Sequence, residues 1–335
     1  MDYRTESPEI LKNFLIYHQA ILGHSKKTVE EYFLDLRNFF RYLRLEKENM
    51  PMETPLDSIS IMEINIDFIK TVQLTDVYNY MHYLGNNRLQ NAKDPNASRG
   101  LSAKTRARKV ATIRTFFKYL TNKEKLLSEN PMQDLDTPRV QTSLPHYLNL
   151  EESIGLLEAV SGKNQKRDYC ILCLFLNCGL RISELVGLNV TDVREDQLRV
   201  LGKGNKERML YLNEACLSAI SDWLVLRQGK NIKNVPALFI TDQKRDRIST
   251  AAVHKLVKKY LTNAGLDSSQ YSSHKLRHTA ATLMLKNGVD VRTLQEVLGH
   301  ENLNTTQIYT HVDNEGLRSA AKANPLAKVK NKNLG

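Results

Sequence analysis

The chain has 335 residues, of which 41% are hydrophobic, a composition that excludes wholesale disorder and allows about two domains. Its formal net charge of +11 favours a polyanionic partner. No apolar run reaches the roughly 20 residues that span a bilayer and the N-terminus lacks signal-peptide regions, so we expect a cytoplasmic protein without a membrane partner.

The first third of the chain predicts several amphipathic helices. One starts at Ser7-Pro8 and ends at Gly23, with the expected buried positions Ile10, Leu11, Phe14 and Ile21. Thr28 and Glu31 predict a capping box at the start of the next helix. Its apolar stripe consists of Val29, Phe33, Leu36, Phe40 and Leu43. After a loop that contains Pro51 and Pro55, helical spacing returns over residues 75–84.

A basic helix is predicted over residues 102–120, after a turn-rich loop. Its apolar positions are Ala107, Val110, Ile113 and Phe117. Its other faces carry cations that we expect to contact DNA phosphates, namely Lys104, Arg106, Arg108, Lys109 and Arg114. The alternative is a basic face that is merely solvated.

Proline-containing turns separate two expected domains. We expect a helical DNA-binding domain over residues 1–130, a linker over 131–146 and a second domain over 147–335. Asn149 with Glu152 predicts the cap of the first helix in the second domain.

The next helix, around DYCILCLFLNC, is predicted to be buried, with three free thiols at Cys170, Cys173 and Cys178. No second C-x-x-C completes a zinc site. Arg181 then follows in apolar surroundings, where a charge needs a partner or a ligand. Glu184 is the candidate partner within the chain.

A β-hairpin is predicted around GKGN, with alternating apolar positions at Leu198, Val200, Met209 and Tyr211. Lys203 and Lys206 lie at its tip, where a lysine is commonly solvated. Further helices are expected over residues 214–227 and 250–261, with a short strand over 237–240 between them.

Residues 272–312 bring together the groups that suggest chemistry. His274, Arg277 and His278 share a helix face, because residues three and four apart are neighbours on a helix. Arginine matches phosphate oxygens, histidine moves protons, and Tyr309 is a candidate nucleophile. This combination favours phosphoryl transfer. Two alternatives remain: a core helix pair with surface cations, or a His274–His278 metal pair, for which no further ligand cluster is nearby.

The motifs H-x-x-R-H, L-G-H and T-T-Q-I-Y-T-H-V resemble the C-terminal signature of the tyrosine recombinases of the phage integrase family, and are most similar to the Xer type. The resemblance implies a mainly α protein with a small β component. Its expected architecture is a two-domain clamp on duplex DNA, with a helical core-binding domain and a mixed α/β catalytic domain.

The resemblance also implies roles for six residues. Tyr309 would attack the scissile phosphodiester and form a 3′-phosphotyrosyl link. Arg181 and Arg277 would hold the non-bridging oxygens, and Lys203 would be the general acid, with Lys206 as the alternative. His274 would assist proton transfer and His300 would bond the phosphate. No metal and no cofactor is expected.

The expected partners are a double-stranded DNA recombination site and a tetramer on two such sites, formed by the chain itself or with a paralogous recombinase. A DNA translocase or an accessory activator is a further expected partner. The expected role is resolution of chromosome dimers at cell division. Alternatives are an integrase or excisionase of a mobile element, a relaxing topoisomerase, and a DNA-binding regulator of the same fold. The tail beyond Val312 is expected to dock on a neighbour.

Overall fold

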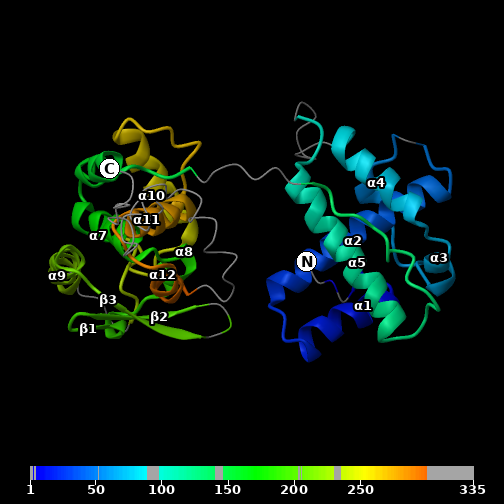
Figure 1. The fold of residues 1–335 in the computed structure, drawn as a ribbon, viewed down its shortest axis with the longest axis horizontal. Helices are drawn as coiled ribbons and strands as arrows, with labels where there is room; N and C mark the ends of the chain where they lie inside the picture. Colours follow the sequence, from blue (N-terminus) through cyan, green and yellow to red (C-terminus); the bar gives the residue numbers. More distant parts are fainter. Residues whose placement is uncertain are drawn as a thin grey trace, which may run out of the picture. The chain divides into compact units, whose positions relative to one another are not determined.

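The computed structural model describes residues 3, 5–51, 53–88, 98–139, 146–202, 204, 206–229 and 235–299. The chain divides into two compact units, Met1–Thr142 and Ser143–Gly335, each with its own hydrophobic core (Figure 1). The described residues are mainly helical with one small sheet, which confirms the predicted fold class. Within them no helix is long and apolar enough to cross a bilayer.

The first unit consists of helices around an aromatic core. They are α1 (Glu9–Ile16), α2 (Lys26–Lys47), α3 (Ile66–Lys70), α4 (Leu74–Asn86) and α5 (Ala103–Asn122). The long helix α2 contacts α1, α4 and α5. Phe116 of α5 packs edge-on against Phe14 and Phe40, with ring centroids 5.3 and 5.5 Å apart. The predicted stripe of α2 is fully buried.

The N-cap of helix α2 lies three residues before the predicted one. Ser25 is its N-cap, and the Ser25 hydroxyl accepts a hydrogen bond from the Thr28 backbone N–H. The predicted Thr28–Glu31 capping box is therefore wrong. Both Ser25 and Thr28 are good capping residues, and the chain uses the earlier one because Lys26 and Lys27 continue the helix.

A single π-helical turn, η1 (Tyr17–Ile21), follows α1 directly. A π turn holds one more residue than an α turn, so the side chains after it are rotated around the axis. His18 is consequently buried, whereas Ile21 is 71% exposed, and the prediction that Ile21 is buried is wrong. Burial, together with the neighbouring His24, lowers the pKa of His18 to about 4.

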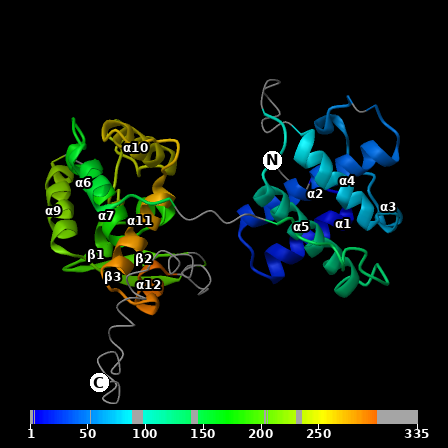
Figure 2. The ribbon, with the colours of Figure 1, turned by 45° about the horizontal axis from the view of Figure 1, so that its top comes forward.

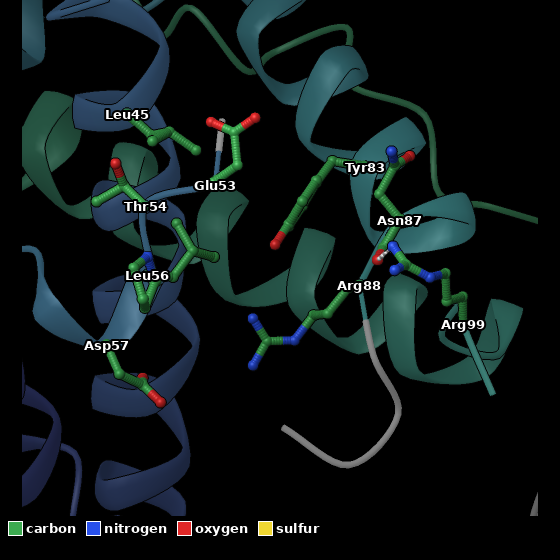
Figure 3. Close-up of a pocket in the computed structure, with 10 residues that line it drawn as sticks. Leu45, Glu53, Thr54, Leu56, Asp57, Tyr83, Asn87, Arg88 and Arg99 are labelled. Atoms are coloured by element: carbon green, nitrogen blue, oxygen red, sulfur yellow. Dashed lines mark hydrogen bonds between the residues drawn. The ribbon is translucent and has the colours of Figure 1, made fainter. Parts of the chain in front are cut away.

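The segments that follow α2 and α4 meet around one cavity of about 470 Å³ in the first unit (Figure 3). Arg88 points toward Asp57 across it, whereas Arg99 donates a hydrogen bond to the Asn87 carbonyl at 3.2 Å.

Gly100 lies close to the backbone of Gly85. Its φ is +86°, and a Cβ at this position would lie 2.2 Å from the Gly85 carbonyl oxygen. Only glycine allows the two backbone segments to come this close.

Asp35 of α2 is the buried polar centre of the first unit. Its carboxylate accepts hydrogen bonds from Arg108 Nη1 and Nη2 at 2.5 and 2.9 Å, from Lys109 Nζ at 2.7 Å and from the Thr112 hydroxyl at 3.1 Å. Burial lowers the pKa of Lys109, and the charge of Asp35 opposes that shift. This carboxylate therefore joins α2 to α5 by charge as well as by packing.

The beginning of the predicted linker packs on the first unit. Met132 and Leu135 are 1% and 2% exposed and belong to that unit's core. The first unit thus uses residues beyond the expected boundary at 130.

The second unit surrounds one buried helix, α7 (Gln165–Cys178), which contacts α9 (Glu214–Gln228) and α11 (Ser273–Lys286) (Figure 2). The other helices of the unit are α6 (Leu150–Glu158), α8 (Ile182–Gly187), α10 (Thr250–Asn263) and α12 (Val291–Leu298). The predicted Asn149–Glu152 capping box is present at the start of α6.

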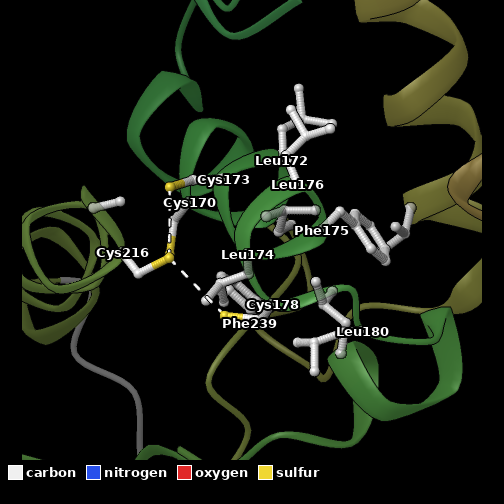
Figure 4. Packing of buried hydrophobic residues seen from close by; sticks show 14 of the residues in the cluster. Cys170, Leu172, Cys173, Leu174, Phe175, Leu176, Cys178, Leu180, Cys216 and Phe239 are labelled. Atoms are coloured by element: carbon white, nitrogen blue, oxygen red, sulfur yellow. Dashed lines mark hydrogen bonds between the residues drawn. The ribbon is translucent and has the colours of Figure 1, made fainter. Parts of the chain in front are cut away.

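The cysteines of α7 form a buried thiol cluster with Cys216 of α9 (Figure 4). The Cys216 sulfur lies 3.9 Å from Cys173 and 4.0 Å from Cys178. All four cysteines are free, as predicted for the three on α7. Burial raises the pKa of the Cys170 thiol, so this thiol stays neutral and packs as a small apolar group.

The sheet contains β1 (Val193–Arg194), β2 (Gln197–Leu201) and β3 (Glu207–Tyr211), all antiparallel. Leu198 pairs with Leu210, and Val200 pairs with Arg208. The hairpin is confirmed, but the inward positions of β3 are shifted by one residue from the predicted apolar alternation. Met209 and Tyr211 are 46% and 75% exposed, because a one-residue change of register exchanges the two faces of a strand.

The predicted strand over residues 237–240 is an extended segment without a ladder. It makes one bridge through Ala237 to Asn189 and another through Ile240 to Arg247, so it pairs with two different segments in turn. Trp223 of α9 packs over this segment, stacked on Phe239, and donates a hydrogen bond from Nε1 to the Leu238 carbonyl at 2.9 Å.

We expect Asp35→Ala to destabilise the first unit by about 3–5 kcal/mol, because the substitution leaves Lys109 buried without its counter-charge. Glu31→Ala is the matched control: it removes an exposed partner of Arg108 and should cost about 0–1 kcal/mol. Hydrogen exchange of peptides from α2 and α5 in the full chain measures both. Equal loss of protection in the two variants would contradict a central role for Asp35.

Candidate active site

Helix α11 places two predicted site residues, His274 and Arg277, in different surroundings. Leu276 and Ala280 face the core, and Arg277 lies beside them with only 2% of its side chain exposed. His274 lies two positions before Leu276 and is exposed. The histidines therefore meet solvent, while the arginine is turned into the protein.

Arg277 is held by the ends of two helices. Its Nη1 donates to the carbonyl of Gly179, after α7, at 2.7 Å, and its Nη2 donates to the carbonyl of Leu298 in α12 at 2.5 Å. Nη1 also lies 3.7 Å from Oε2 of Glu184. Carbonyls at helix C-termini carry partial negative charge, so both acceptors suit a guanidinium.

The chain reaches Arg181 through a left-handed turn at Gly179, where φ is +58°. A Cβ at this position would lie 2.8 Å from Leu298 Cδ2, so the close packing of α7 on α12 requires glycine. Arg181 is the N-cap of α8, and its side chain is 35% exposed. Of the two arginines predicted to bind phosphate, Arg181 is thus the one whose side chain is accessible from solvent.

Glu184 pairs with Arg181, as the chain-internal alternative predicted. Its carboxylate accepts from the Arg181 backbone N–H at 2.9 Å and from Arg181 Nη1 at 2.7 Å. Arg181 Nη2 also reaches the carbonyl of Gly299 at 3.3 Å. This pairing accounts for the charge in apolar surroundings, and the phosphate-binding role of Arg181 stays a prediction.

Arg208 is a third arginine of this cluster, and the sequence analysis missed it. Its Nη1 and Nη2 donate to the two oxygens of Glu184 at 3.0 and 2.9 Å, and its Nε donates to the Val297 carbonyl at 2.9 Å. A Cβ on Gly299 would lie 3.1 Å from Nη1. The available signal was a charged residue on the inward face of β3, which the correct hairpin register would have shown.

The four side chains form a cluster that we call the arginine–Glu184 cluster: Arg181, Arg208, Arg277 and Glu184. Burial by itself raises the pKa of Glu184, but the hydrogen bonds from Arg208 and Arg181 outweigh it and hold that pKa below its ordinary value. The carboxylate is therefore ionised at neutral pH. Three guanidinium groups against one carboxylate leave positive charge in excess, which favours an anionic ligand.

His274 and His278 form a pair on the exposed side of α11. Their Nε2 atoms are 3.1 Å apart, and the rings meet edge to face with centroids 4.5 Å apart. At this distance one ring donates a hydrogen bond to the other. The pair can hold or transfer a proton on the first turns of α11.

Three predicted site residues, Lys203, His300 and Tyr309, lie outside the described residues. The structure describes the alternative lysine, Lys206, which is exposed and whose carbonyl accepts a hydrogen bond from the Gly202 N–H at 2.7 Å. It also describes the chain up to Gly299, whose φ of +63° ends α12 as predicted.

The predicted DNA-contacting residues of α5 lie in unlike environments. Lys104 and Arg114 are exposed, and Arg106 lies against Gly85 of α4. Arg108 is 44% exposed and paired with Asp35 and Glu31, whereas Lys109 is 7% exposed and bonded to Asp35. Lys109 thus has a structural partner inside the unit.

The chain matches known proteins over most of its length. The phage integrase family profile matches residues 147–315. The tyrosine recombinase XerC of Caldanaerobacter subterraneus subsp. tengcongensis is 48% identical over 322 residues, which cover 96% of this chain and 88% of that protein. The tyrosine recombinase XerD of Rickettsia bellii is 31% identical, with 96% and 99% covered.

Solved structures show the same fold. XerH bound to a palindromic difH substrate, a post-cleavage complex, matches with a TM-score of 0.63 at 24% identity, covering 94% of each chain. A lambda integrase dimer bound to a COC′ core site matches with a TM-score of 0.58 at 14% identity, covering 91% of this chain and 78% of that one. The chain therefore belongs to the phage integrase family, as a tyrosine recombinase of the Xer type that cuts and rejoins DNA at specific sites.

Proposed function

We propose that this recombinase cleaves duplex DNA through a 3′-phosphotyrosyl link to Tyr309 and rejoins it with a new partner strand. The observation that carries the proposal is the arginine–Glu184 cluster, which concentrates three guanidinium groups around one carboxylate. In the reaction, the guanidinium groups of Arg181 and Arg277 hold the non-bridging phosphate oxygens and stabilise the charge that builds on them.

The proton transfers fall to residues around this cluster. Tyr309 attacks the phosphorus and loses its phenolic proton, and His274 assists that transfer. Lys203 protonates the 5′ oxygen as it leaves, and His300 bonds the phosphate. The covalent link preserves the energy of the phosphodiester, so the 5′-hydroxyl of another strand can reverse the step without ATP or a metal ion.

We further propose that four protomers act on two DNA sites, either as copies of this chain or with a paralogous recombinase. The reaction resolves chromosome dimers at cell division, in the cytoplasm, with a DNA translocase or accessory protein as activator. Similarity to Xer recombinases over nearly the whole chain supports this role. A plasmid with two copies of a site from the replication terminus tests it: recombinant products support resolution, and relaxation without recombinants would indicate a topoisomerase.

Tyr309→Phe should form no covalent adduct with DNA while binding it with unchanged affinity, because the change removes one hydroxyl and no charge. Denaturing electrophoresis detects the adduct, and a gel shift measures affinity. Tyr211→Phe is the matched control, since that tyrosine is 75% exposed on β3 and should cleave normally. An adduct that survives denaturation in Tyr309→Phe would place the nucleophile elsewhere.

Lys203→Ala should slow cleavage about 10²–10⁴-fold, as expected for loss of a general acid. A 5′-phosphorothiolate substrate should largely restore its rate, because a sulfur leaving group needs little protonation. Lys206→Ala should show a mild defect and little rescue. Arg181→Ala should remain slow on both substrates, since it acts on the non-bridging oxygens. Rescue of Lys206→Ala instead would assign the acid to that lysine.

DNA affinity should fall with salt at a slope of about −0.9 per neutralised phosphate. Lys104→Ala and Arg114→Ala should each make the slope less steep by about 1, because both residues are exposed on α5. Lys109→Met should leave the slope unchanged, since Asp35 already neutralises that charge. Fluorescence anisotropy across a salt series measures all three. A shallower slope for Lys109→Met alone would reverse this assignment.

A further inference from the structure

His278 has no part in the proposed reaction, yet it faces His274 across one turn of α11. The two Nε2 atoms are 3.1 Å apart and the ring planes are inclined by 78°. Both residues lie on the accessible side of the helix, where the i and i+4 positions are neighbours.

This arrangement fits the geometry of a chelate. An imidazole nitrogen binds Zn²⁺ at about 2.0–2.1 Å. Two nitrogens 3.1 Å apart that both keep this distance subtend an angle of about 100° at the ion. That angle lies between the roughly 90° of octahedral sites and the roughly 109° of tetrahedral ones. The distance between the two nitrogens therefore allows both to bind one metal ion.

We propose that His274 and His278 bind a divalent transition-metal ion of the Zn²⁺ or Ni²⁺ kind, and that this ion inhibits the recombinase. The ion replaces the hydrogen bond between the rings: the donor ring releases its Nε2 proton to solvent and takes up a proton on Nδ1, so that both Nε2 lone pairs coordinate. Among the described residues no group of three possible metal ligands occurs, and the proposed site uses the two histidines together with water.

The nearby arginine does not block this site. Arg277 lies between the two histidines in sequence, but its guanidinium is directed to the Gly179 and Leu298 carbonyls and is 2% exposed. Glu184, 3.7 Å away, partly offsets its charge.

Metal binding withdraws His274 from the reaction. A coordinated Nε2 can neither move a proton nor bond the phosphate, so the metal and the scissile phosphate compete for the same ring. Metal binding as such is independent of the proposed function, whereas inhibition rests on it. The two parts therefore need separate measurements.

Calorimetric titration of the untagged full chain with Zn²⁺, and separately with Ni²⁺, tests binding. We expect one site per chain, and about a 100-fold weaker affinity in His278→Gln, which keeps an amide donor but loses the chelate. The matched control is His82→Gln, which changes an exposed helical histidine whose i+4 neighbour is Asn86; it should bind like the wild type. Circular dichroism verifies folding. Equal affinity in His278→Gln would exclude the site.

Inhibition is tested by the ratio of cleavage rates with and without Zn²⁺ within each variant, so that changes in basal rate cancel. Zn²⁺ should slow cleavage by the wild type and by His82→Gln, and a chelator should restore both rates. Cleavage by His278→Gln should be largely insensitive to Zn²⁺. Inhibition of His278→Gln to the same extent would place the inhibitory ion elsewhere. Absence of cleavage in every variant without metal would instead contradict the proposed function, and the calorimetric result would still decide the metal site.

Discussion

The catalytic unit depends on one buried carboxylate, that of Glu184, whose acceptor positions are all occupied by hydrogen bonds. Each oxygen of Glu184 accepts two hydrogen bonds, one from Arg181 and one from Arg208. An ionised carboxylate offers about four acceptor positions, so no position remains for Arg277. Arg277 accordingly gives its donors to backbone carbonyls and meets Glu184 only at 3.7 Å.

This arrangement links elements that are distant in sequence. Arg208 joins the hairpin to the last turn of α12, and Arg277 joins α11 to the ends of α7 and α12. Removing this carboxylate would leave the three guanidinium groups without the acidic partner that they share. The charged groups of the arginine–Glu184 cluster thus fix the positions of the hairpin, α8 and α12.

Local features of the fold and the site were predictable from the sequence, whereas features that depend on long-range pairing were not. The Asn149–Glu152 box and the Arg181–Glu184 pair lie three residues apart, so helix geometry alone brings each pair together. The inward position of Arg208 depends on the hairpin register, which alternation alone placed one residue away. The π turn after α1 also leaves no mark in composition, so Ile21 was predicted on the wrong side.

The chain contains one tryptophan, Trp223, and the second unit buries it against Phe239. The first unit has tyrosines but no tryptophan. Fluorescence excited at the red edge of the tryptophan band therefore reports on the catalytic unit alone, whereas far-ultraviolet dichroism reports on both units. The natural sequence thus carries a spectroscopic label by which the unfolding of one unit can be followed separately from the other.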